Sequence, residues 1–84
     1  MSTQNVTVTN QWTKVIEDSA TAFLLSHNHV DYIEIAITST DTPPLEGLKG
    51  HILGFTEAIT RNTLGAGFVW AKSSSPTSYL IISA

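Results

Sequence analysis

The strand period is clearest in residues 30–38, which read VDYIEIAIT. Because successive side chains of a strand point to opposite faces, one face carries the isoleucines Ile33, Ile35 and Ile37. Tyr32 and Glu34 fall on the other face, together with two small residues. Such alternation predicts a strand with one face in a core and the other toward water or a partner.

The same period continues on both sides of this stretch. Apolar and polar residues alternate or cluster in short runs that predict further strands at residues 6–16, 20–26, 68–72 and 78–82. Residues 6–16 are read as one long or kinked strand. Residues 20–26 are apolar on both faces, which favours a central position in a sheet. The link through Ser26-His27-Asn28-His29 predicts a hairpin, because Asn tolerates left-handed backbone.

Two later segments break this pattern. Residues 39–50 hold a Pro-Pro pair and two glycines, which predict the longest loop. In residues 51–60 the apolar side chains of Ile52, Phe55 and Ile59 have helical spacing, whereas Gly54 and β-branched threonines disfavour a helix. The pattern leaves strand and helix as alternatives for residues 51–60, and one or two short strands are favoured.

Six to seven short strands separated by turn residues predict an all-β fold, a small antiparallel β-sandwich or barrel. The 84 residues suit a single β domain over 1–84, with residues 1–5 as a candidate flexible arm. A chain of this size buries only about 60–65% of its unfolded surface. Because cysteine is absent, disulfides cannot add stability, and homo-oligomerisation becomes the favoured remedy.

Charge and hydropathy exclude several classes of partner. The net charge is −3, only 13% of residues are charged, and no basic run is present, so no nucleic-acid partner is expected. No apolar run approaches the ~20 residues that span a bilayer, so no membrane partner is expected. The N-terminal residues lack the pattern of a secretory signal, which predicts a soluble chain that carries no export signal.

Candidate chemical sites are few. His27 and His29 lie two residues apart, but a zinc site would need further ligands, such as His51 and Asp31, brought close by the fold. Solvated turn histidines are the favoured interpretation, and no metal or cofactor is predicted. No Gly-x-Ser-x-Gly motif or cysteine nucleophile is present, and so small a fold leaves little room for a deep sugar cleft between carboxylates. The expectation is a protein that is not an enzyme.

Four residues are candidates for an interface: Trp12, Tyr32, Glu34 and Trp70. For both tryptophans, packing in the core or between subunits is favoured over stacking on a sugar or a partner. Tyr32 and Glu34 share the strand face opposite the isoleucines, so they could form an interface surface. A plain solvated face is the favoured alternative for that pair.

Several short pieces carry a family resemblance: a polar N-terminal stretch, Trp12-Thr13-Lys14-Val15, residues 32–38, the loop that leads to Gly50-His51, residues 69–73 and residues 80–83. In their order they resemble small virion proteins of tailed bacteriophages. The resemblance covers most of the chain but has no diagnostic motif, and no site residue is carried over from it.

The resemblance implies a non-enzymatic structural part of the virion. Such proteins decorate or cement a capsid, or belong to head fibres. The implied partners are further copies of the chain, with a trimer as the first expectation, and the major capsid protein or another virion protein. Two alternatives stay open, a small carbohydrate-binding β module that uses Trp12 or Trp70 and a tail-associated adaptor. A metal enzyme or hydrolase using His27, His29 or His51 is least favoured.

Overall fold

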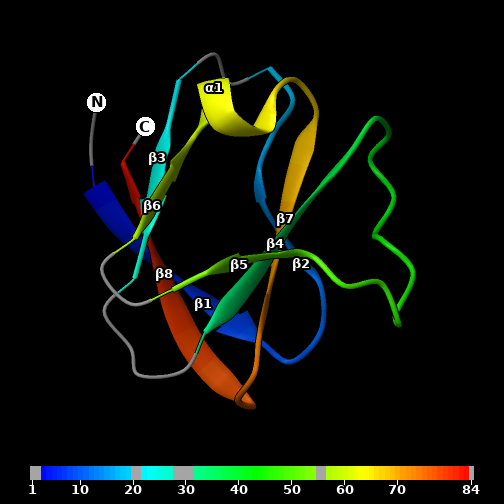
Figure 1. Cartoon of the computed structure of the whole chain (residues 1–84), viewed down its shortest axis with the longest axis vertical. Coiled ribbons are helices and arrows are strands. Elements are labelled where there is room, and N and C mark those ends of the chain that lie inside the picture. The colour runs from blue at the N-terminus through cyan, green and yellow to red at the C-terminus, as the bar shows by residue number, and fades with distance from the viewer. Residues whose placement is uncertain (1–2, 20–21, 28–31, 55–56, 84) are drawn as a thin grey trace.

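The computed structural model describes residues 3–19, 22–27, 32–54 and 57–83, which form two packed β-sheets (Figure 1). The elements in chain order are β1 (Thr3–Thr9), β2 (Thr13–Ile16), β3 (Leu24–Ser26), β4 (Ile33–Thr38), β5 (His51–Leu53), β6 (Ala58–Thr60), the single helical turn α1 (Arg61–Leu64), β7 (Phe68–Ser73) and β8 (Thr77–Ser83). The predicted all-β, sandwich-like fold is confirmed. Within these residues, no helix has the length and hydropathy to cross a bilayer.

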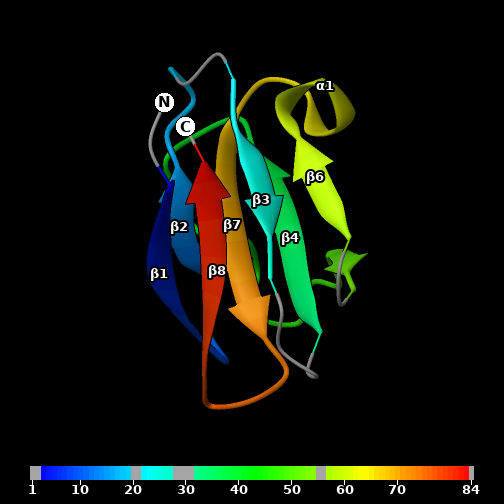
Figure 2. The same ribbon diagram turned by 90° about the vertical axis from the view of Figure 1, so that its left-hand side faces the viewer.

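The strands are divided equally between the two sheets, which face each other in Figure 2. One sheet, here called the terminal sheet, has the order β1-β8-β3-β6, and the other, the long-loop sheet, has the order β2-β7-β4-β5. Every pairing in both sheets is antiparallel. Among strands that follow each other in the chain, only β4 and β5 are hydrogen-bonded neighbours.

Chain-adjacent strands take equivalent places in the two sheets. The pairs β1/β2, β8/β7, β3/β4 and β6/β5 occupy the first to fourth positions of the two strand orders. Each of these connections is therefore an arch from one sheet to the other, rather than a hairpin within a sheet. The predicted hairpin between residues 20–26 and 30–38 is wrong, because β3 and β4 belong to different sheets; residues 28–31 lie outside the described part.

The N-terminal prediction is also corrected. Residues 6–16 do not form one strand, because the chain leaves the terminal sheet after Thr9 and enters the long-loop sheet at Thr13. Residues 3–5 are not an arm: they belong to β1, and Thr3 is paired with Ser83 of β8. Residues 1–2 lie outside the described residues.

Other predicted elements agree with the structure. β3 is an inner strand of the terminal sheet, between β8 and β6, as its two apolar faces indicated. Residues 51–60 hold the two short strands β5 and β6, which settles the choice between strand and helix for their described part. Residues 39–50, the predicted longest loop, connect β4 to β5.

The core lies between the inward faces of the sheets. Its fully buried side chains come from both layers and include Leu25, Leu80 and Ile82 of the terminal sheet and Ile33, Ile35 and Val69 of the long-loop sheet. The isoleucine face of β4 thus points into the core, as the alternation in the sequence predicted. Apolar burial of this kind contributes about 1.5–3 kcal/mol for each large side chain.

Candidate functional site

The outward face of the long-loop sheet gathers most of the candidate residues. Because paired residues in antiparallel strands share a face, the register places Lys14, Trp70 and Ala36 in one row across β2, β7 and β4. The neighbouring row holds Lys72, Glu34 and Ile52. Aromatic and charged side chains therefore alternate on a face that sequence alone had assigned to water or a partner.

Glu34 is the centre of this face and is only 8% exposed. Its Oε1 accepts a hydrogen bond of 3.0 Å from the backbone N–H of Gly50. Its Oε2 lies 3.8 Å from Lys72 Nζ, and both side chains are largely shielded from water. The carboxylate therefore links the end of the long loop to the middle of the sheet.

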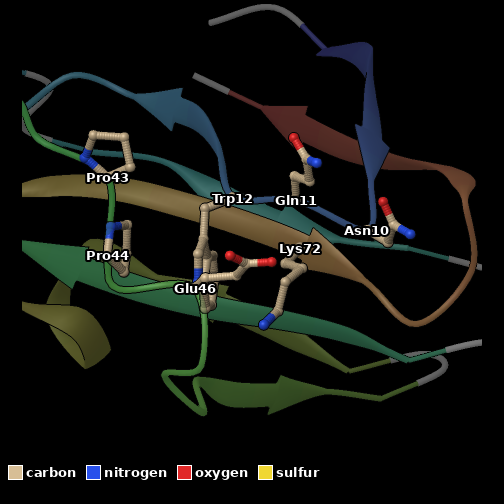
Figure 3. A pocket seen from close by; sticks show the side chains of 7 residues that line it. All are labelled: Asn10, Gln11, Trp12, Pro43, Pro44, Glu46 and Lys72. Carbon is tan, nitrogen blue, oxygen red and sulfur yellow. The ribbon is translucent and has the colours of Figure 1, made fainter.

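Trp12 completes this arrangement from the connection between β1 and β2. Lys72 Nζ lies 4.6 Å from the centre of the Trp12 ring system, within the range of a cation–π interaction. In Figure 3 the indole stands between Pro44 on one side and Lys72 on the other. Trp12 thereby packs against the cation of the Glu34–Lys72 ion pair, and its exposure is intermediate.

A cleft of about 310 Å³ opens beside this tryptophan (Figure 3). Its lining comes from the β1–β2 connection, the long loop and β7, and consists of Asn10, Gln11, Trp12, Pro43, Pro44, Glu46 and Lys72. The indole Nε1 of Trp12 is buried and has no hydrogen-bond acceptor among the described residues. The cleft therefore contains two amides, a carboxylate and an aromatic ring. Together these groups can bind a polar, uncharged ligand.

Trp70 has a structural role on the same face. It is 5% exposed, and its Nε1 donates a hydrogen bond of 2.8 Å to Thr38 Oγ1 on the neighbouring strand. Beside it in the register, Lys14 contacts Asp41 at 3.0 Å and Glu17 at 3.1 Å. The hydrogen bond to Asp41, followed by that to Glu17, raises the pKa of Lys14 above its ordinary value. The long loop is thus held on the sheet at both Lys14 and Glu34.

The four predicted interface residues therefore separate into two groups. Trp12, Glu34 and Trp70 lie together on one face, but Glu34 and Trp70 are buried by other parts of the same chain. The solvated face favoured for Glu34 is wrong for that reason. Tyr32 is 47% exposed and presents surface just before β4. Lys72 was not predicted, although its alternation with Trp70 on the strand 68–72 placed it on the same face.

Within the described residues, His27 and His51 are not part of a cluster of metal ligands. His27 is 2% exposed and its Nε2 donates a hydrogen bond of 2.6 Å to the carbonyl oxygen of Leu53, so the predicted solvated turn position is wrong for it. His51 is exposed on β5, and His29 and Asp31 lie outside the described residues. In the described ranges, no group of three or more potential ligands converges on one point.

No known protein family, curated protein or solved structure matches the chain. The surface chemistry is therefore the basis for assigning it a role. Apart from the cleft, its clearest feature is a set of exposed apolar side chains: Leu45 at 83%, Ile52 at 55%, Tyr32 at 47% and Leu48 at 45%. They come from the long loop and from the β4 and β5 side of the long-loop sheet.

Proposed function

We propose that the chain is a non-enzymatic structural protein that assembles with copies of itself and docks on a larger particle. A capsid decoration, cement or head-fibre component of a phage virion has this role. The observation that carries the proposal is the exposed apolar set of Leu45, Leu48, Ile52 and Tyr32. These side chains come from the long loop and from the β4 and β5 side of the long-loop sheet, and exposed apolar side chains of this kind are typical of protein–protein contacts.

The attachment of the long loop supports a docking role. Leu45 and Leu48 belong to a turn in which the Leu48 N–H donates a hydrogen bond of 2.9 Å to the Leu45 carbonyl oxygen. The same loop is anchored at Asp41 by Lys14 and at Gly50 by Glu34. A loop held at both sides of this turn loses less conformational freedom on binding, so more of the burial energy remains as affinity.

Analysis of purified particles tests this proposal directly. Mass spectrometry of virions from the protein's source is expected to find the chain at a stoichiometry comparable to that of a capsid protein. Absence of the chain, or its presence only in traces, would overturn the proposal.

Variants locate the docking surface. Leu45→Ser with Leu48→Ser is expected to lower occupancy on depleted particles, because each leucine that loses burial costs about 1.5–3 kcal/mol of binding energy. Leu24→Ser is the matched control, since Leu24 is 40% exposed but lies on the terminal sheet. Equal loss of binding in the control and the double variant would contradict the assignment of this surface.

The cleft beside Trp12 favours carbohydrate binding as a second candidate function. Asn10, Gln11 and Glu46 offer hydrogen-bonding groups next to the indole. A glycan array is expected to show binding that Gln11→Ala weakens, together with a change in tryptophan fluorescence when the glycan is added. An array without signal would reject this candidate and leave the structural role unaffected.

A further inference from the structure

The four sheet edges are protected to very different extents. Strand edges carry unpaired backbone N–H and C=O groups, and proteins shield them with short strands, charged residues, proline or bulges. β2 has four residues, contains Lys14 and changes register against β7 between Lys14 and Ile16. β5 and β6 have three residues each. These three edges therefore present few backbone groups with which a further strand could pair.

β1 has none of these devices. It is an edge strand of seven residues, reads TQNVTVT, and contains neither proline nor charge. Its register with β8 is regular from Thr3↔Ser83 to Thr9↔Thr77. Figure 2 shows it at the border of the molecule, with no described strand beyond it in its own sheet. The backbone N–H and C=O groups on the outer side of β1 are therefore available to pair with another strand.

We propose that β1 is a self-association edge that pairs antiparallel with β1 of a second copy of this chain. The inference deepens the proposed homo-oligomeric function and rests on it. A twofold axis perpendicular to the sheet would join the two terminal sheets into one continuous sheet of eight strands. The contact is isologous, so it produces dimers or other even-numbered assemblies in place of a simple trimer.

The two faces of β1 suit this pairing. A register centred on Val6 pairs all seven residues and sets Asn5 opposite Thr7 of the second copy. Val6 and Val8 pack toward the core, so the two copies of Val6 would meet on the core side. Thr3, Asn5 and Thr7 are exposed and would form cross-strand pairs of polar, β-sheet-compatible side chains on the outer face.

Charge explains why a second copy is the fitting partner. The chain has a net charge of −3, so association of two copies generally brings like charges together. At β1 no charged side chain is present, and pairing with itself creates no like-charge contact. An identical strand also matches in length, so no polar group at the new junction is left unpaired by a shorter partner.

A charge-swap experiment tests the pairing. Light scattering is expected to give the unaltered chain the mass of a dimer. Asn5→Lys with Thr7→Lys is expected to halve that mass, because lysines would face lysines across the axis. Asn5→Glu with Thr7→Glu should do the same. An equimolar mixture of the two variants should recover the dimer mass, since lysines then face glutamates.

The controls separate this inference from the proposed function. Ser39→Lys with Thr42→Lys adds the same charge at exposed loop positions and is expected to leave the dimer intact. Circular dichroism should show that all variants stay folded, because the substituted side chains are exposed. A trimer, or a lysine variant that still dimerises, would overturn the β1 pairing alone, whereas a monomer would overturn both the β1 pairing and the self-assembly in the proposed function. None of these results bears on whether the chain is found in particles.

Discussion

Gly50 lies where the long loop returns to the outer face of the sheet. A Cβ at this position would stand 2.7 Å from the Ile35 carbonyl oxygen and 2.9 Å from Trp12 Cη2. Gly50→Ala is therefore expected to lower the free energy of unfolding by about 1–3 kcal/mol, as overpacking does. Urea unfolding followed by tryptophan fluorescence measures the loss.

The same loop provides the control for this prediction. A Cβ at Gly47 would meet nothing within 4 Å, so Gly47→Ala is expected to change the unfolding free energy by less than about 0.5 kcal/mol. If both alanine variants had equal stability, the close approach of the loop to Trp12 and β4 would not exist in solution.

Glu34 and Lys72 lead to a second prediction at this scale. Lys72→Met removes the cation from both Glu34 and the Trp12 ring, and it leaves a shielded carboxylate without its counter-charge. Glu34→Gln is expected to cost less, because the amide oxygen can still accept the Gly50 N–H. In a double-mutant cycle on unfolding free energies, the pair should show a coupling of about 0.5–3 kcal/mol. Additive single effects would mean that the two side chains do not interact.

How far sequence could predict this site depends on the residue. Alternation along residues 30–38 placed Glu34 on the face opposite the isoleucines, and the structure keeps it there. For Trp70 the sequence favoured packing in the core or between subunits, and the structure buries it on the same outward face. The sequence could not show that Glu34 is shielded, because its partner Gly50 and the Trp12 ring beside Lys72 come from segments that have no period of their own. Burial of Glu34 depends on contacts between segments far apart in the chain.

At the scale of elements, Arg61 holds the four-residue helix α1 and the neighbouring connections in place. Its Nη1 donates hydrogen bonds of 2.8 and 3.0 Å to the carbonyl oxygens of Gly65 and Gly67. Its Nη2 donates one of 3.0 Å to the carbonyl oxygen of Glu17, and the guanidinium lies 4.7 Å from the centre of the Phe23 ring. The side chain thus fastens the β6–β7 connection to the β2–β3 connection.

Removing this side chain should loosen both connections. Arg61→Met is expected to lower the unfolding free energy by about 1.5–3 kcal/mol, the range for hydrogen bonds to a charged group. Arg61→Lys should recover only part of it, because an ammonium cannot reproduce the planar fork. Lys49→Met makes the same change in net charge at an exposed site and should be nearly neutral. If thermal unfolding shows that Arg61→Met destabilises the protein no more than Lys49→Met does, this role of Arg61 is contradicted.

The arches explain which elements sequence could and could not predict. Period and turn residues located most of the strands, including the two short ones within residues 51–60, but joined β1 and β2 into one. They did not show that β3 and β4 lie in different sheets, because a turn suits a hairpin or an arch equally well. A hairpin and an arch differ in how the second strand contacts the first. In a hairpin the two strands are hydrogen-bonded, and in an arch they pack against each other through side chains. That choice depends on which partner strands are available, here β8 and β6 for β3.

For the whole molecule, the consequence of this topology is that strand pairing is almost entirely non-local. β1 and β8 come from opposite ends of the chain yet pair along their full length (Figure 1). Between them, Thr3 Oγ1 lies 2.8 Å from Ser83 Oγ. Non-local pairing slows folding, because a long loop must close before its contacts form. Refolding of this small domain should therefore fall in the millisecond-to-second range of β-sandwiches.

Circular permutation tests whether the β1–β8 pairing limits that rate. A short Gly-Ser linker that joins residue 84 to residue 1, with new termini between the exposed Asp18 and Ser19, turns the most distant strand pair into a local hairpin. The new termini separate no hydrogen-bonded pair of consecutive strands, because β2 and β3 belong to different sheets. Stopped-flow tryptophan fluorescence should show faster refolding of the permutant than of the original chain carrying the same linker at its end. The joined ends leave the β1 edge open, so light scattering should give both chains the same mass. Equal refolding rates would place the limiting step elsewhere, such as in the closure of the long loop between β4 and β5, which the permutation leaves intact.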